Sequence, residues 1–232
     1  MLRRENFPIG IRSVAKNLRS GLLLGLNREI GYFRWLIRFK ILRKLNSHLD
    51  TSRTGEVDYS LENFRIYTPL VRIEYPLYLL RSIPNANKDS LLIIGPRFEN
   101  EFLIAMGLGW KKQNLRGLDL FSYSNFVDIG NMHSMPYEDD LFDSVICSWT
   151  LSYSLEPQKL AAEISRTTKS KGIVIFAVDK VKESNGGLKG ILQGNARIQN
   201  VSSIHALFPG AKLLANFEPE TEGWTICALE LP

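Results

Sequence analysis

Gly95 and Asp119 each follow directly after an apolar run, at a spacing typical of a ligand-binding edge. Gly95 ends the run Ser90-Leu-Leu-Ile-Ile, and Asp119 comes 24 residues later at the end of a second apolar segment. Glycine lets the backbone turn sharply and approach a ligand, and a carboxylate at a strand end can accept both hydroxyls of a ribose. Together the two residues indicate a nucleoside site.

Three further positions complete this candidate site. The amide of Asn131 is suited to hydrogen-bond the edge of an adenine, and Met132 or Leu120 is suited to cover its face. Ser148 falls near the end of another apolar run, 142–149, so we expect its hydroxyl at the same edge.

His133 and Tyr153 are the weak candidates for catalysis. Histidine titrates near neutral pH and could act as a general base. Two structural interpretations stay open beside these: packing of the loop for His133, and a core or ligand-covering ring for Tyr153. The spacing of Cys and His predicts no metal site.

Alternating strands and helices must position these residues. We predict strands at 90–95, 115–120, 126–129, 142–149 and 173–178, and helices at 77–82, 99–110 and 157–167. This alternation predicts an α/β fold, a doubly wound and mostly parallel sheet. Segments 211–217 and 223–231 form an expected antiparallel C-terminal hairpin, because the loop between them is short. Only six residues separate Asp119 from Phe126, so we expect the crossover helix there to shrink to about one turn.

The N-terminal part differs from the rest in charge. Residues 1–50 hold eleven Lys or Arg and three acids, a net charge of +8, within a chain of +5. We therefore divide the chain into a basic helical extension or lid, 1–85, and a Rossmann-like domain, 86–232. Within the extension, 21–45 shows apolar residues at helical spacing, but its charges exclude a transmembrane segment.

Two roles remain open for this extension. The helix either packs beside the ligand opening, the interpretation that we favour, or makes a peripheral contact with an anionic membrane. Binding of nucleic acid is disfavoured, because no aromatic residues are interleaved with the basic ones. The two cysteines and the lack of a secretory signal indicate a cytoplasmic protein.

The segment after the third predicted strand resembles a known family. Gly130-Asn-Met-His-Ser-Met-Pro-Tyr-Glu-Asp-Asp-Leu-Phe-Asp-Ser-Val145, then Glu163-Ile-Ser-Arg166 and Lys169-Ser-Lys-Gly172, resemble the motifs of class I S-adenosylmethionine-dependent methyltransferases of the type 11 kind. Ile94-Gly-Pro-Arg97 is similar to the loop of a bacterial subgroup. The resemblance covers roughly 91–178 and implies S-adenosylmethionine as the cofactor.

The loop departs from the family pattern of three alternating glycines. Gly95 remains, while Arg97 and Glu99 stand at the other two positions, and the acid expected at Asn131 is an amide. We expect Arg97 to pair with the carboxylate of the cofactor and Glu99 to serve its amino group, although capping of the following helix is an alternative for Glu99.

The resemblance implies a methyltransferase that acts on a small molecule, a sugar or a lipid-linked acceptor. Two alternatives remain: a catalytically silent methyltransferase-like binding module, which the missing glycines favour, and a nicotinamide-dependent oxidoreductase. The second alternative fits the Gly95 turn but does not fit the 130–145 motif.

Overall fold

The structure is a computed structural model of the 232-residue chain. It describes residues 26, 29–47, 67, 73–84, 89–179, 198, 200–218 and 223–232. The boundary expected between 85 and 86 lies outside the described residues, as do residues 21–25, 27 and 28 of the expected N-terminal helix.

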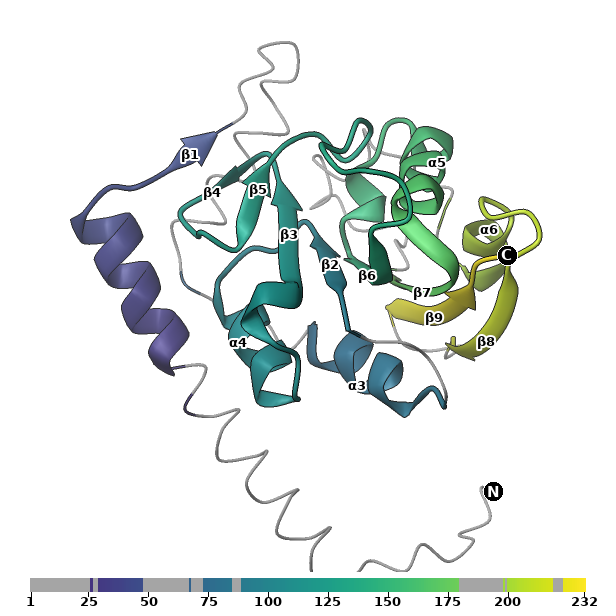
Figure 1. The fold of residues 1–232 in the computed structure, drawn as a ribbon, viewed down its shortest axis with the longest axis horizontal. Helices are drawn as coiled ribbons and strands as arrows, with labels where there is room; N and C mark the ends of the chain where they lie inside the picture. Colours follow the sequence, from purple (N-terminus) through teal and green to yellow (C-terminus); the bar gives the residue numbers. More distant parts are fainter. Residues whose placement is uncertain are drawn as a thin grey trace, which may run out of the picture.

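A seven-stranded sheet forms the centre of the molecule, in the order β5-β3-β2-β6-β7-β9-β8 (Figure 1). The first five strands in this order are parallel, and β9 and β8 are antiparallel to their neighbours. The expected mostly parallel sheet with a C-terminal antiparallel hairpin is therefore confirmed. The strands are β2 (Leu91–Ile94), β3 (Leu115–Asp119), β5 (Val127–Ile129), β6 (Phe142–Ser148), β7 (Thr168–Asp179), β8 (Lys212–Phe217) and β9 (Trp224–Glu230).

Helices cover both faces of the sheet and bury a separate apolar layer on each. On one face, α3 (Glu74–Ser82) and α4 (Asn100–Gly107) pack through Leu77, Leu80 and Phe102. On the other, α5 (Pro157–Thr167) and α6 (Val201–His205) pack in the layer that contains Leu160, Ile164 and Ile204. The four residues of β2 are all buried, because the strand is covered on both faces.

The strand order reverses between β2 and β6. From β2 the chain moves to β3 and β5 on one side, and then returns to β6 and β7 on the other. The carboxyl ends of β2 and β6 therefore border the crevice in which doubly wound folds bind their ligands. Gly95, Asp119 and Ser148 all lie at this edge.

Two features of the fold differ from the sequence-based prediction. The expected one-turn helix after Asp119 is wrong: the segment instead contains the short strand β4 (Phe121–Ser122), which pairs antiparallel with β1 (Asn46–Ser47). The strand pairing gives Phe121 and Ser122 backbone partners on the N-terminal segment, in place of the hydrogen bonds of a helical turn. The helix α6 was not predicted, although Asn200 and Ser203 form a capping box at its start.

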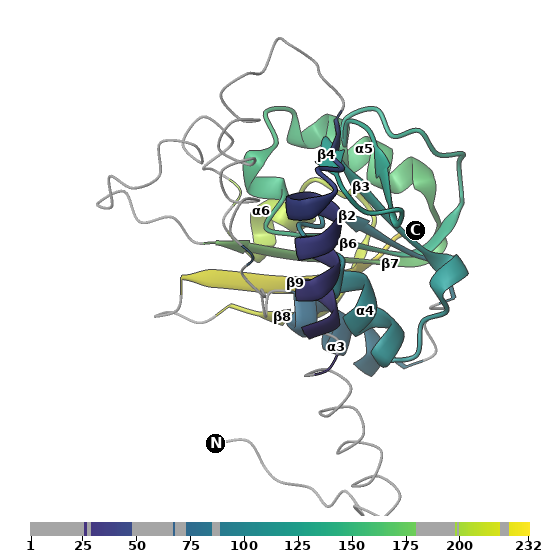
Figure 2. The ribbon, with the colours of Figure 1, turned by 90° about the vertical axis from the view of Figure 1, so that its left-hand side faces the viewer.

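The N-terminal segment packs on the body of the molecule as a helix. Residues 29–35 are α-helical and continue into a π-helical segment, Leu36–Ile41. The helix lies beside α4 at the left of Figure 1 and crosses in front of the sheet in Figure 2. Trp35 is buried against Phe98 and Tyr123, in a cluster that also includes Phe121. We call these four residues the aromatic cluster.

Candidate functional site

Gly95 makes the turn that leaves β2. Its φ of +71° is in the left-handed region, which glycine adopts without strain. The Gly95 amide donates to the carbonyl of Leu118 at 2.8 Å, so the turn is tied to β3. A Cβ on Gly95 would lie 2.1 Å from Oγ1 of Thr150, whose hydroxyl donates to the Ile94 carbonyl at 2.9 Å. The turn needs glycine, and Thr150 occupies the space directly over it.

Asp119 lies beside Gly95 at the same edge. Leu118 faces Ile94 in the parallel register, so the two strands deliver Asp119 and Gly95 side by side. The carboxylate accepts a hydrogen bond from the Leu120 amide at 2.7 Å. Desolvation raises the pKa of Asp119, and hydrogen bonds from the Leu120 and Phe121 amides oppose this. With smaller effects of Glu101, which raises it, and Arg97, which lowers it, the pKa is about 7. This side chain can therefore change charge near neutral pH.

Glu101 organises the loop between β2 and α4. Its Oε1 accepts the backbone amide of Arg97 at 2.7 Å and that of Phe98 at 3.4 Å. The carboxylate therefore occupies loop amides at the start of α4, where the helix dipole favours negative charge. Sequence reasoning did not assign Glu101, although an acid in the first turn of the predicted helix was the signal for it.

Arg97, Ser148 and Tyr153 line a small cavity of about 60 Å³ at this edge. Within the described residues, the Arg97 guanidinium forms no hydrogen bond or ion pair, and the buried Ser148 hydroxyl has no hydrogen-bond partner. Trp149, between Ser148 and Thr150, has a φ of +61°, a rare conformation for a non-glycine residue. Ligand pockets usually measure ~300–1,000 Å³, so this cavity takes only part of a nucleoside cofactor without rearrangement.

Glu99 serves a different role from the one expected. Its carboxylate is fully buried and pairs with Arg34 and with Arg38, whose Nη1 lies 2.8 Å from Oε1. The Glu99 amide donates to the hydroxyl of Tyr123 at 3.1 Å. The side chain therefore holds the N-terminal helix, and contact with a cofactor amino group stays a prediction. The side chain makes no cap hydrogen bond to α4.

The side chains that we expect to contact an adenine are in contact with other residues of the protein. Oδ1 of Asn131 accepts from the His133 amide at 2.9 Å and lies 3.0 Å from Nδ1 of the His133 ring. The side chain of Met132 packs on the core, and that of Leu120 on the aromatic cluster. Of these, Leu120 is nearest in sequence to Asp119 and keeps a half-buried position.

His133 is buried, and both of its ring nitrogens have partners. Nε2 lies 2.7 Å from the hydroxyl of Ser154, and Nδ1 faces Asn131. The ring thereby joins the 131–134 loop to the end of the 3-10 turn Leu151–Tyr153. This arrangement corresponds to the packing interpretation of His133 rather than to a base that faces an acceptor.

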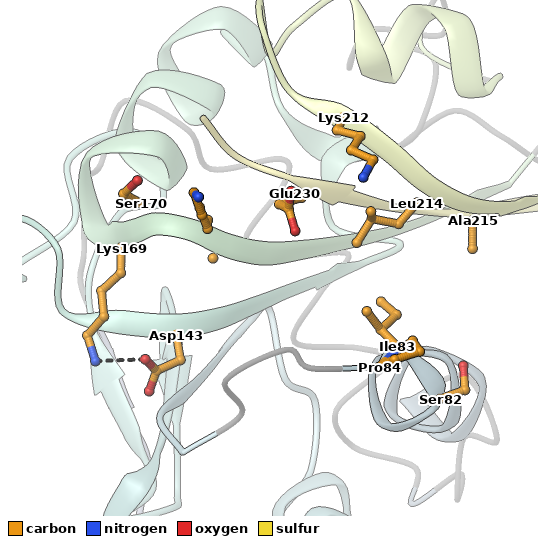
Figure 3. Close-up of a pocket in the computed structure, with 12 residues that line it drawn as sticks. Ser82, Ile83, Pro84, Asp143, Lys169, Ser170, Lys212, Leu214, Ala215 and Glu230 are labelled. Carbon is orange, nitrogen blue, oxygen red and sulfur yellow. Dashed lines mark hydrogen bonds and ion pairs between the residues drawn. The ribbon is translucent and has the colours of Figure 1, made fainter.

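A larger cavity, of about 730 Å³, lies at the opposite edge of the sheet (Figure 3). Lys169 and Asp143 approach each other there, with Nζ and Oδ1 2.8 Å apart. Lys212 and Glu230 project from the C-terminal hairpin on the other side. Asp143 stands near the amino end of β6, so the cavity is remote from the carboxyl edge that bears Gly95 and Asp119.

Among the residues that the structure describes, none of the helices has the length and the hydrophobicity of a transmembrane span. The same part of the chain holds no group of three or more His, Cys, Asp or Glu side chains arranged for a metal ion.

A family model described as a methyltransferase domain matches residues 107–176. The match agrees with the resemblance of the sequence to S-adenosylmethionine-dependent methyltransferases, and the strand order defines a Rossmann-like fold. The Ile-Gly-Pro-Arg subgroup stays a prediction. Comparison with curated proteins gives no match.

Solved structures support the same fold. A geranyl diphosphate methyltransferase in complex with S-adenosylmethionine is 11% identical, with a TM-score of 0.53 over 70% of this chain and 85% of that one. An S-adenosylmethionine-dependent methyltransferase from Listeria monocytogenes is 15% identical, with a TM-score of 0.50 over 70% and 99%. A protein from Pyrococcus horikoshii OT3 is 14% identical, with a TM-score of 0.51 over 70% and 90%.

Proposed function

We propose that this chain is an S-adenosylmethionine-dependent methyltransferase whose acceptor is a small molecule, a sugar or a lipid-linked compound. One observation carries the proposal: the Asp119 carboxylate and the left-handed turn at Gly95 leave adjacent parallel strands side by side at the switch point. The methyltransferase-domain match over 107–176 supports it, as does a structural neighbour that binds S-adenosylmethionine.

The residues of this edge fit the two ends of that cofactor. The Asp119 carboxylate is suited to the ribose hydroxyls, and the Arg97 guanidinium, without an ion pair in the described residues, is suited to the methionine carboxylate. The buried Ser148 hydroxyl lines the same cavity and lacks a partner. The Glu99 carboxylate is held by Arg34 and Arg38, and Oδ1 of Asn131 is held by His133, so neither group is offered to the cofactor in this structure.

When bound, the cofactor would supply a methyl group, carried on a positively charged sulfur, to an acceptor atom, and would leave as the neutral thioether. Such a transfer depends mainly on proximity and in-line alignment. The chain's own contribution is therefore to hold and orient: Asp119 at the ribose, Arg97 at the carboxylate, and Glu101 by fixing the loop amides. His133 is not assigned a proton-transfer role, because both of its ring nitrogens are engaged.

Thermal shift and calorimetry with S-adenosylmethionine and S-adenosylhomocysteine test this proposal. A ligand at 100 times its dissociation constant should stabilise the fold by about 2.7 kcal/mol. Asp119→Ala should weaken binding by ~1–3 kcal/mol, and Arg97→Lys should weaken it by losing the two-pronged contact with a carboxylate. Glu230→Gln, at the opposite edge, is the control and should bind as the wild type does. Unchanged affinity in Asp119→Ala would remove this residue from the site.

A catalytically silent binding module is the second candidate. It is favoured by Thr150, which fills the space over Gly95, and by the small volume of the adjoining cavity. If neither ligand raises the melting temperature nor gives heat on titration, this second candidate replaces the first.

We also propose a bacterial cytoplasmic setting. Cys147 and Cys227 are both free and buried, which is consistent with a reducing compartment. Fractionation of cells that express the full chain tests the compartment.

A further inference from the structure

The N-terminal helix has two apolar faces, and the fold uses only one of them. Trp35 is 5% exposed and packs with Phe39 on the body. On the opposite side the chain presents five large apolar side chains that are 39–65% exposed. We call these the outer stripe: Leu26, Ile30, Phe33, Ile37 and Ile41.

The spacing of the outer stripe places its members along one line of the helix. At about 100° per residue in the α-helical part, Ile30 and Phe33 fall within about 60° of one another, and Trp35 lies on the opposite side. Ile37 and Ile41, in the π-helical segment that follows, are 49% and 65% exposed. Figures 1 and 2 show the helix at the margin of the molecule, with one side toward the body and the other side free of described elements. A helix that only packed on the domain would need one apolar face, so the second face requires another explanation.

Positive charge accompanies the outer stripe. Arg43 and Lys44 are exposed just beyond the carboxyl end of the helix, whereas Nζ of the exposed Lys40 lies over the ring of Trp35, 5.3 Å from its centroid. The only acid among residues 29–47 is Glu29, and residues 1–50 carry a net charge of +8. An apolar line bordered by cations is the composition of helices that lie in the interface of an anionic bilayer.

We propose that the outer stripe docks on the surface of an anionic lipid bilayer, with the helix parallel to the membrane plane. Phe33 and the aliphatic side chains enter the boundary between headgroups and acyl chains, while Arg43 and Lys44 contact the anionic headgroups. The proposal does not depend on the proposed methyl transfer.

The charges disfavour the other occupants of this surface. Two copies of the chain that paired through the outer stripe would bring two strongly basic segments together, which is electrostatically unfavourable. Nucleic acid would contact the cations but offers no apolar layer for five exposed hydrophobic side chains, because its backbone contacts are polar.

The residues on the inner side of the helix determine which part of the domain lies near the membrane. Arg34 and Arg38 hold the buried carboxylate of Glu99, which belongs to the loop between β2 and α4. A helix with side chains is about 10–12 Å wide, so the docked outer stripe would hold this loop about one helix diameter from the headgroups. The Gly95 edge would then lie close to lipid-linked molecules.

Vesicle flotation of the full-length protein tests this proposal. We expect the wild type to float with vesicles of phosphatidylcholine and phosphatidylglycerol but much less with phosphatidylcholine alone. Phe33→Asp should lower the partition coefficient about tenfold or more, because a charge replaces a buried aromatic ring. The matched control is Phe217→Asp, which adds the same charge at an aromatic residue of similar exposure, 51% against 57%, on β8; it should float as the wild type does.

A second pair of variants keeps the test valid if a phenylalanine variant fails to fold. Ile37→Asp lies on the outer stripe at 49% exposure, and Leu155→Asp lies off it at 41%. Melting temperatures equal to that of the wild type establish that each variant compared is folded.

Three results would overturn the proposal. The first is an absence of flotation with either vesicle. The second is equal flotation of wild type and Phe33→Asp, which would place binding in basic residues away from the outer stripe. The third is a dimer of the lipid-free wild type in light scattering that Phe33→Asp converts to a monomer, because the outer stripe would then be covered by a second copy.

Discussion

The Glu99 carboxylate, fully buried, lies 2.8 Å from the guanidinium of Arg38, 61 residues earlier in the chain. Arg34 binds the other oxygen of the same carboxylate. The family that the chain resembles has a glycine at position 99 as one of three in its loop, but this chain uses the position to attach its N-terminal helix. The loop between β2 and α4 is therefore also the site at which the N-terminal helix is attached.

Glu99→Gln should destabilise the fold. The substitution leaves two arginines without their buried acceptor charge, and because both guanidinium groups are partly exposed we expect a loss of about 1–3 kcal/mol. Chemical denaturation measures it. Glu156→Gln is the control, since the Glu156 carboxylate is exposed and 3.8 Å from Lys159, and should cost less than about 0.5 kcal/mol. Equal losses in both variants would contradict the attachment role of Glu99.

The protonation of Asp119 should make stability depend on pH. Burial raises its pKa to about 7, above the unfolded value of about 3.9, so the folded state binds the extra proton between these values. The stability present at low pH should fall as the pH rises from about 4 to about 7 and then level off. Asp119→Asn should lack this fall in a series of denaturation curves.

Asp143 provides a control of opposite sign. Burial opposes ionisation of its carboxyl, but hydrogen bonds from Lys169 and Ser90 outweigh burial and lower the pKa. Asp143 should therefore stabilise the fold above its unfolded pKa, and this stability should be lost as the pH falls through the lower folded value. The Asp119 prediction would be refuted if the unfolding free energies of the wild type and of Asp119→Asn depended on pH in the same way.

Gly95→Ala should be strongly destabilising. The new Cβ would meet the Thr150 hydroxyl at 2.1 Å, and alanine is strained at a φ of +71°. Left-handed strain of about 1–2 kcal/mol and overpacking of about 1–3 kcal/mol should add to a clear fall in melting temperature. Gly223→Ala meets nothing within 4 Å and should be nearly neutral. A melting temperature within error of wild type for Gly95→Ala would mean that the turn is built differently.

Asn100→Leu should stabilise the protein. Both polar atoms of the Asn100 side chain are buried and have no hydrogen-bond partner, and the residue lies under Gly31 of the N-terminal helix. Removing an unsatisfied polar group should raise the unfolding free energy by about 1 kcal/mol.

Asn200→Leu is the opposite case. Its Oδ1 accepts the Ser203 amide at 2.8 Å and caps α6, so we expect a loss of about 1 kcal/mol. If both asparagine variants destabilise the protein to the same extent, Asn100 has a partner that the described residues do not provide.

The sequence by itself determined the sheet, its principal helices and the edge that carries the candidate site. The helix predicted at 157–167 is α5, and the strand predicted at 142–149 is β6 within one residue. Both follow from local chemistry, since apolar periodicity and a proline at the first helical position report directly on the backbone. The positions of Gly95 and Asp119 can be predicted from the sequence, because each residue lies at the carboxyl end of a predicted strand.

Only the tertiary structure decided which partners the other residues have. Glu99 had the same local sequence signal for a ligand contact as for a cap, yet it binds arginines more than 60 residues away. The local sequence likewise does not determine that β1 pairs with β4, or that the outer stripe is exposed. Periodicity tells which residues share a face, but the neighbour that covers this face, or leaves it open, is chosen by how distant elements pack together.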